Sequence, residues 1–562
     1  MILEENDEKD LNSESTENTV EEENLDQNEE SVEELNSDDS KEQDEFADNE
    51  IADSDDSNAS GFDKFFGITK RGSTLRTEIL AGIVTFLSMC YILTLNPTTI
   101  VGSGSNLWGS VFIATALGAV VGTLLMALLA KMPLAQASGL GLNSMVSNAM
   151  LGSLVAGKVY SFGNIMLLVF ISGIIFILLS VVPYKRDKET GRLVAIREAI
   201  YTGMPVQLRT AISVGIGLFI TIIGLVNCGI IGAKDDSMFL TTIDLLPFNS
   251  KAVWEKGGAG RTAMVMLFAL FVIAILQHYK VKGAVIIGIL AGTLLAWPLG
   301  ATSTDILLGK TDGASWKFWE NFKNFFSLSQ DEGGTFFVIF TEGFKNFPEG
   351  SLFGSIVVVI TFCMIDMFDT MGTVVGCCST AKLMDDNGMP YNYNKIMLSD
   401  SIATCAGAVL GTSTVTTFVE SGSGIAAGGK TGVTALTAAV LFFLSIFLMP
   451  IFKFIPSCAC AAALVYVGVL MMSNVKHVDF LTPKYAIPAF MTIIFMPFGY
   501  SITDGIGMGV LSFVIINFIC YIIDVILYKN GVKEEKPKFE ISVVLAIVAA
   551  LFVIYFFVPT SI

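Results

Sequence analysis

The sequence predicts an all-α polytopic membrane protein, and three observations lead to that fold class. The chain of 562 residues is 52% hydrophobic. Only 15% of its residues are charged, whereas a soluble protein carries about 25%. Long apolar runs follow one another along the chain, each close to the ~20 residues that a helix needs to cross ~30 Å of hydrocarbon. A large water-soluble globule is therefore excluded.

Twelve apolar runs are long enough for membrane spans, and two shorter glycine-rich runs complete a predicted set of fourteen segments. In order they lie at 79–100, 108–130, 133–150, 163–183, 210–231, 263–279, 281–299, 354–376, 396–411, 413–430, 432–452, 459–473, 485–501 and 505–528. The short ones are the third and the tenth. A last run, 541–558, is either a fifteenth span or a terminal helix packed on the bundle.

The formal net charge of −19 is a property of the first 60 residues. This segment holds 25 of the 53 acidic residues and two of the 34 basic ones. It cannot bury enough apolar surface to offset its ordering entropy, so we predict a disordered tail. It lacks the basic and apolar regions of a secretory signal. A solvated cytoplasmic tail is the simplest interpretation, and a role in partner binding or trafficking is the alternative.

Lys and Arg in the short loops predict the orientation. They lie before the first span and after every second one, for example Lys70, Arg197, Lys280, Lys430 and Lys529. All these loops share one parity, so the rule places them and the N-terminus in the cytoplasm. The agreement supports counting both glycine-rich runs as crossings, because omitting one would invert the loops that follow.

The sequence indicates neither a metal site nor disulfide bonds. All nine cysteines lie in or at the ends of apolar runs, where they are typical small core residues. The two histidines are far apart, and no spacing of His, Cys or carboxylates suggests metal ligands. We expect no metal and no cofactor.

Two short patterns recur in the same order and predict an inverted repeat. Thr-Phe occurs at 85 and 361, and Ser-Gly-x-Gly occurs at 138 and 421. Because the first span starts inside and the eighth outside, two seven-span halves would have opposite orientations. We therefore divide the chain into the tail (1–60), a first repeat (61–300), an extracellular or interfacial loop (301–350), a second repeat (351–530) and a hydrophobic end (531–562).

Paired glycine-interrupted segments at matching positions are the best sequence indication of a transporter's binding site. Pro133 and the glycines favour a strand or loop followed by a half helix. The backbone candidates for substrate contact are Gly139, Gly141, Ser421, Gly422 and Gly424. The alternative is that the glycines only permit tight helix packing.

Ionisable groups inside the membrane are costly and mark functional sites. Asp366 and Asp369 lie in the eighth span, three residues apart and so on one helical face, and Glu420 lies in the tenth segment. Asn143 is the polar residue of the third segment. Close carboxyl groups in a low-dielectric interior cannot all ionise, so one of them is expected to carry a proton. Helix capping or bonding to nearby threonines is the structural alternative.

One motif is misleading. Residues 424–431 fit G-x-x-x-x-G-K-T, the phosphate-binding loop. That loop needs a preceding strand and a soluble α/β domain around it. Here it joins two membrane segments, so we do not expect nucleotide hydrolysis or any other enzyme activity.

The motifs RTEILAGIVTFLSMCYILTLNP, SGLGLNSM, MFDTMGT and VESGSGIAAGGKTGVTAL resemble the guanine/hypoxanthine (AzgA-like) branch of the nucleobase–ascorbate transporter and xanthine/uracil permease superfamily. The resemblance covers about 62–530. It implies fourteen spans in two inverted repeats, with a core domain (spans 1–4 and 8–11) and a gate domain (5–7 and 12–14). Ser138 and Ser144 depart from the family pattern, which commonly has Pro and Ala at these places; this difference bears on substrate preference.

The resemblance further implies proton-coupled purine uptake at the plasma membrane, with substrate residues at Asn143, Asp366 and Glu420, supported by Asp369. Glu420 and Asp366 are the candidates for proton coupling. A purine offers ring N–H donors and N or O acceptors, which a carboxylate and an amide can meet. Tyr91, Phe362 and Phe418 are the candidates to stack on its ring.

The substrate could be hypoxanthine, guanine, adenine or xanthine, and the sequence does not choose among them. Partners are the purine and the lipid bilayer, with a homodimer left open and no nucleic acid. An anion (sulfate- or bicarbonate-type) or pyrimidine transporter on the same fold is the nearest alternative. A membrane sensor acting through the acidic tail is a remote one.

Overall fold

The computed structural model describes residues 61–150, 159–186, 193–233, 243–245, 248–255, 258–308, 316–327, 333–348, 350–384, 389–499, 501–532 and 535–557. The predicted acidic tail lies outside these residues. The chain divides into two units, residues 1–70 and 71–562. In the first, helix α2 (Gly61–Phe66) precedes a turn where the Thr69 hydroxyl donates to Asp63 at 2.5 Å. This bond lowers the pKa of the Asp63 carboxyl.

The elements of the second unit follow the predicted segments closely. The first half contains α3 (Leu75–Met89), α4 (Ile92–Val101), α5 (Trp108–Leu125) with a π-helical turn (Met126–Ala130), β1 (Gln136–Ser138), α6 (Leu140–Met150), α7 (Phe162–Val181), β2 (Pro183–Arg186), β3 (Leu193–Ala195), α8 (Ile196–Thr202), α9 (Val206–Asn227), β4 (Ile231–Ala233), β5 (Ile243–Leu245), a 3₁₀ turn (Ala252–Trp254), α10 (Ala259–His278) and α11 (Ala284–Ala296). The first span has a short irregularity at Cys90–Tyr91, between α3 and α4, where both residues keep right-handed helical backbone angles.

The second half repeats the pattern after two short helices in the predicted loop. It contains α12 (Phe318–Phe325), α13 (Val338–Thr341), α14 (Leu352–Thr380), α15 (Tyr393–Leu410), β6 (Val415–Thr417), α16 (Ser421–Ala426), α17 (Gly432–Ser445) with a 3₁₀ turn (Ile446–Leu448), α18 (Met449–Phe454), α19 (Ser457–Met472) with a 3₁₀ turn (Ser473–His477), α20 (Pro483–Phe498), α21 (Ile502–Lys529) and α22 (Val543–Phe557). Within the described residues, all fourteen predicted segments are thus present in order.

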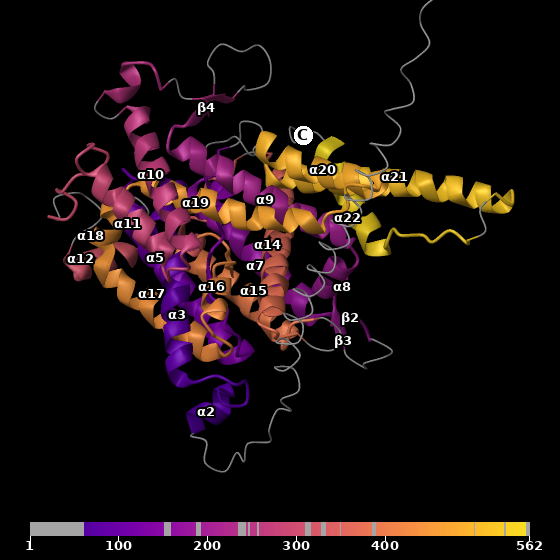
Figure 1. Ribbon diagram of the computed structural model, residues 1–562, viewed down its shortest axis with the longest axis horizontal. Helices are drawn as coiled ribbons and strands as arrows, with labels where there is room; N and C mark the ends of the chain where they lie inside the picture. Colours follow the sequence, from indigo (N-terminus) through magenta and orange to yellow (C-terminus); the bar gives the residue numbers. More distant parts are fainter. Residues whose placement is uncertain are drawn as a thin grey trace, which may run out of the picture. The chain divides into compact units, whose positions relative to one another are not determined.

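The helices sort into two packed groups. Helices α3–α7 pack with α14–α17 and form the core domain, whereas α9–α11 pack with α19–α21 and form the gate domain. Figure 1 shows α9, α19, α20 and α21 side by side, with α3, α15, α16 and α17 forming a separate group. The two domains meet where α9 and α19 face α4, α6 and α14.

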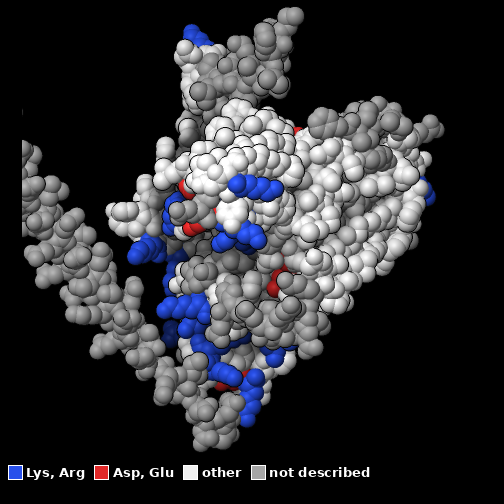
Figure 2. Space-filling view, turned by 90° about the vertical axis from the view of Figure 1, so that its right-hand side faces the viewer, with Lys and Arg blue, Asp and Glu red and all other residues white. Residues whose placement is uncertain are grey.

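Lipid-facing surfaces follow from helical periodicity. Ile171, Ile174 and Leu178 of α7 are exposed, and their spacing places them on one side of the helix. Exposed apolar stripes of this kind suit a bilayer and not water. Figure 2 shows a broad area largely without charged side chains beside a region where Lys and Arg gather. Nine helices of the described residues are long and apolar enough to cross a membrane; the other five predicted segments are shorter or more polar.

Of the two sequence patterns that recur, one occupies equivalent positions in the two halves of the structure and the other does not. Thr85 and Thr361 lie at similar positions along their helices, ten residues after Leu75 and nine after Leu352. The serines of Ser-Gly-x-Gly do not match: Ser138 ends β1, whereas Ser421 begins α16. The second half has a longer strand-to-helix connection, and the tetrapeptide identity is therefore not a structural equivalence.

The C-terminal apolar run forms α22, which packs against α21 and α8. Just before it, the Ser542 hydroxyl donates to the Gly203 carbonyl oxygen at 2.9 Å. Lys484 and Tyr485 of α20 both bond to the Glu540 carboxylate. The segment is therefore attached to the bundle at both the linker helix α8 and the gate domain.

Candidate functional site

The two broken segments meet in the middle of the core domain. Strands β1 and β6 pair antiparallel, with Ala137 opposite Thr416. The ladder is extended by Gly139 N–H donating to Thr414 O and Phe418 N–H donating to Ala135 O. Each strand is followed by a half helix, α6 or α16, after a connection that is longer in the second half. Irregular backbone of this kind is tolerated inside a membrane only where protein buries it or where it lines a cavity.

Most glycines of the two motifs allow close packing against neighbouring elements, and one of them, Gly422, has open space around it. The Ser421 hydroxyl accepts from Ala135 N–H at 3.0 Å, so it ties the two broken segments together. A Cβ on Gly424 would lie 2.7 Å from the Ala81 carbonyl oxygen of α3, and one on Gly139 would lie 3.1 Å from Thr416 Oγ1. Gly422 is open, because the nearest atom, Cys377 Sγ, is 3.9 Å away. Gly141 is closed off by Ile502 of α21.

The predicted polar residues lie on three elements of the core domain. Asn143 is on α6, Asp366 and Asp369 are on α14, and Glu420 immediately precedes α16. Asp366 is fully buried, and Asn143 and Glu420 are nearly so, while Asp369 is partly exposed. Asp369 lies within electrostatic range of Glu420. Helix α14 packs against both α6 and α16, which brings the three elements together.

Two of these side chains have a polar atom left over. Asn143 Oδ1 accepts from the Ser413 hydroxyl, whereas its Nδ2 has no partner among the described residues. Asp366 Oδ2 accepts from Thr404 Oγ1 at 3.3 Å, whereas its Oδ1 has no partner there. A buried polar atom without a partner is costly. Of the predicted site residues, Asn143 therefore has one donor and Asp366 one acceptor that no described residue satisfies.

Glu420 has a partner that the sequence did not indicate. The Tyr91 phenol, placed between α3 and α4, donates to Glu420 Oε1 at 2.5 Å. Tyr91 thus bonds a candidate carboxylate, although we predicted it as a stacking residue. Phe418 lies two residues before Glu420 and is buried, and Phe362 is fully buried on α14.

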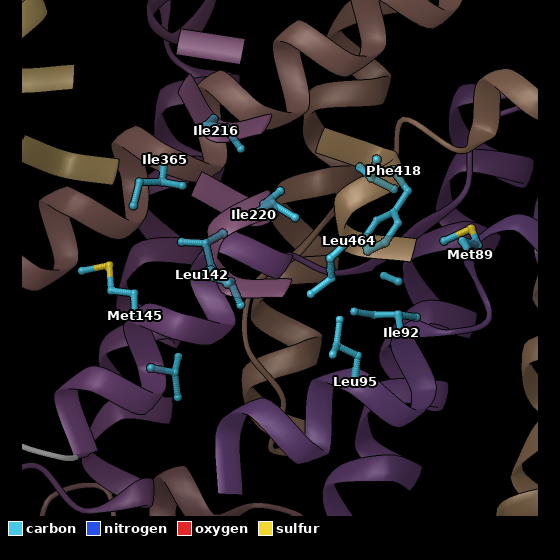
Figure 3. Close-up of a cluster of buried hydrophobic side chains, with 14 of the residues drawn as sticks. Met89, Ile92, Leu95, Leu142, Met145, Ile216, Ile220, Ile365, Phe418 and Leu464 are labelled. Carbon is cyan, nitrogen blue, oxygen red and sulfur yellow. The ribbon is translucent and has the colours of Figure 1, made fainter. Parts of the chain in front are cut away.

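Apolar side chains from both domains surround this region. Figure 3 shows Met89, Ile92 and Leu95 of the first span together with Leu142, Met145, Ile365 and Phe418 of the core domain and Ile216, Ile220 and Leu464 of the gate helices α9 and α19. They belong to one continuous hydrophobic cluster. The polar groups of the core domain therefore lie beside an apolar boundary with the gate domain.

The structure adds a buried ion pair that the sequence did not indicate. Arg197 lies in the connection between α7 and α9, where we expected a loop residue, but its side chain is buried against the core, where its Nη2 donates to Asp400 Oδ2 at 2.8 Å. The reason is that the short helix α8 folds back onto α7 and α14. Asp400 was missed although it lies within the predicted span 396–411. The rule that marks Asp366, a carboxylate inside an apolar run, applies equally to it.

The resemblance of residues 424–431 to a phosphate-binding loop has no functional counterpart. The Glu78 carboxylate accepts from the backbone N–H groups of Lys430 and Thr431, at 2.9 and 3.2 Å, and from the Thr434 hydroxyl at 2.6 Å. Two of the backbone donors in this stretch are therefore occupied by an internal carboxylate. Among the described residues, no group of three His, Cys, Asp or Glu side chains could hold a metal ion.

Comparisons with known proteins agree with this architecture. A xanthine/uracil permease model, described as "Permease family", matches residues 76–508. The guanine/hypoxanthine permease PbuO of Bacillus subtilis is 34% identical over 453 residues, which cover 80% of this chain and 93% of PbuO. The adenine permease AdeP of Escherichia coli is 32% identical over 451 residues, which cover 80% of this chain and 89% of AdeP.

Among solved structures, the transmembrane domain of the cyanobacterial bicarbonate transporter BicA is similar with a TM-score of 0.50 at 13% identity. The match covers 77% of this chain and 97% of that domain, and it shows the fold of two inverted seven-span repeats. The chain therefore belongs to the permease family, within the xanthine/uracil permease and nucleobase–ascorbate transporter superfamily.

Proposed function

We propose that this protein imports purine nucleobases across the plasma membrane by proton symport, through alternating access between its core and gate domains. The observation that carries the proposal is that two buried atoms, Asp366 Oδ1 and Asn143 Nδ2, have no partner among the described residues. An acceptor and a donor beside apolar walls suit a flat neutral heterocycle that presents N–H and ring-nitrogen groups. The names of the relatives PbuO and AdeP support a purine substrate.

Glu420 and Asp366 have complementary roles in this proposal. Glu420 lies at the start of the half helix α16, where its second oxygen can accept a purine N–H while Tyr91 holds the first. Asp366 exchanges the coupling proton. Moving one proton through a membrane potential of 100 mV supplies ~2.3 kcal/mol, enough for about 50-fold accumulation of a neutral base. We take the coupling ion to be a proton and propose no other cofactor.

An anionic substrate, the nearest alternative, fits this site poorly. Glu420, Asp366 and Asp369 would repel it. The buried guanidinium that acts on Asp366, that of Arg197, is already bound to Asp400. We further place the N-terminus in the cytoplasm, because the loops rich in Lys and Arg share its side.

Uptake of radiolabelled hypoxanthine into cells that lack their own purine carriers tests the proposal. Glu420→Ala and Asp366→Ala should each abolish accumulation while inserting normally, and Glu320→Gln, at an exposed carboxylate, should match the wild type. Normal transport by both site variants would refute the assignment of these residues. Wild-type uptake of uracil or sulfate without any purine would refute the substrate class.

A further inference from the structure

Arg197 is held by the core domain through four contacts. Besides the bond to Asp400, its Nη1 donates to Met397 O at 3.3 Å and to Ser401 Oγ at 3.2 Å. Its guanidinium carbon lies 4.5 Å from the centre of the Phe176 ring. The side chains of Arg197 and Asp400 are 1% and 0% exposed. Because arginine stays protonated in proteins, a buried partner at this distance is bound as a carboxylate.

The second oxygen of Asp400 is committed to the scaffold of the site. Its Oδ1 accepts from Thr370 Oγ1 at 2.8 Å and from Gln136 Nε2 at 3.2 Å. Thr370 is one turn beyond Asp366 on α14, and Gln136 begins the strand β1. Asp400 therefore connects the linker helix α8 with the two elements that carry Asp366 and lead to Asn143.

Asp366 lies beside this pair in a different environment. The charged and titratable groups that act on it are Asp400, Arg197 and Asp369, and Tyr393 and Cys363 also lie within electrostatic range of Arg197. Its one bond, from Thr404, is long, and its Oδ1 has no described partner. The carboxyl groups of Asp400 and Asp366 thus differ. Both oxygens of Asp400 accept hydrogen bonds and one is paired with a cation, whereas one oxygen of Asp366 has no partner among the described residues.

We propose that Arg197 is a positioning residue for transport, which keeps Asp400 ionised and bound to α14 and β1 and so leaves Asp366 as the carboxyl group that exchanges the coupling proton. The transport part of this inference rests on the proposed function. The ionisation of Asp400 does not. Without Arg197, Asp400 binds a proton, because an unpaired buried charge is costly. Asp400 and Asp366 then compete for the coupling proton. Accumulation is then lost, whereas exchange of substrate across the membrane, which needs no net proton movement, continues.

The experiment compares Arg197→Met, Asp400→Asn and the double variant with the wild type, and uses Arg76→Met, at an exposed arginine, as the matched control. Accumulation and counterflow exchange of hypoxanthine are measured in proteoliposomes with and without a proton gradient. We expect Arg197→Met to lose at least tenfold in accumulation while keeping exchange. The double variant, which removes both charges, should recover accumulation to within about threefold of the wild type.

Infrared absorption of protonated carboxyl groups in the purified protein supplies a readout that needs no substrate. Asp400→Asn should leave this band unchanged in the wild-type background and should remove intensity in the Arg197→Met background. Loss of intensity in the wild-type background would overturn the proposal, as would equal loss of exchange and accumulation in the single and the double variant. If the wild type transports no purine, the proposed function fails, and the infrared comparison still decides the state of Asp400.

Discussion

Gly424→Ala tests whether the close contact between half helix α16 and helix α3 positions the site. The added Cβ would lie 2.7 Å from the Ala81 carbonyl oxygen and would overlap Thr85 Oγ1. That hydroxyl already donates to Ala81 O at 3.0 Å, so it has little freedom to turn away. An ordinary contact begins at 3.4 Å, so α16 must move by at least about 0.7 Å to clear the Ala81 oxygen, and further to clear Thr85 Oγ1. Overpacking of this kind costs about 1–3 kcal/mol.

The functional cost follows from the position of Glu420, the residue immediately before α16. A helix that moves away from α3 carries this carboxylate away from Tyr91. Misplacement of a positioned group by ~1 Å can reduce a rate about 100-fold. We therefore expect uptake efficiency to fall between about 10- and 100-fold, together with a lower melting temperature of the purified protein.

Gly422→Ala is the matched control on the same half helix. Its Cβ would meet nothing closer than Cys377 Sγ at 3.9 Å, so the methyl group fits and the helix gains propensity. Its melting temperature should equal or exceed that of the wild type. Wild-type stability and uptake for Gly424→Ala would refute the reasoning, and so would an equal loss of stability in both variants.

Two further predictions concern the hydrogen bonds that hold span 1 to the second repeat. Glu78→Gln should lower stability by about 1.5–3 kcal/mol, because the carboxylate bonds two backbone N–H groups ahead of α17 and the Thr434 hydroxyl; unchanged thermal unfolding would contradict it. Tyr91→Phe should raise the KM for purine about tenfold or more at near-normal stability, because the phenol is the described donor that orients Glu420. Kinetics at fixed pH measure this effect, and a change in maximal velocity alone would argue against it.

The membrane architecture was predictable because it depends on local composition. A run of about 20 apolar residues must cross the hydrocarbon as a helix whatever its neighbours are. The interruption of segments 3 and 10 was also visible, since Pro133 and the glycines disfavour a continuous helix. The strand-then-half-helix form of both segments is confirmed by β1 with α6 and β6 with α16.

The partners of the polar residues were not predictable to the same degree. Tyr91 and Glu420 are 329 residues apart, and Arg197 and Asp400 are 203 apart. A contact over such a separation depends on how helices pack, and hydropathy carries no information about it. Arg197 shows the consequence most clearly, because its position between two predicted spans does not indicate that its side chain is buried against Asp400.

The sequence by itself determined that the chain is a membrane protein of fourteen segments with two broken ones, because hydrophobic length and helix-breaking residues act locally. It also indicated Asp366, Asp369 and Glu420 as carboxyl groups inside predicted membrane segments, although Asp400, which meets the same criterion, was missed. Only the tertiary structure decided which of these groups are satisfied and which are open. Pairing takes two side chains at hydrogen-bond distance, and packing alone sets that distance. Asp400 is therefore paired with Arg197, whereas Oδ1 of Asp366 has no partner among the described residues.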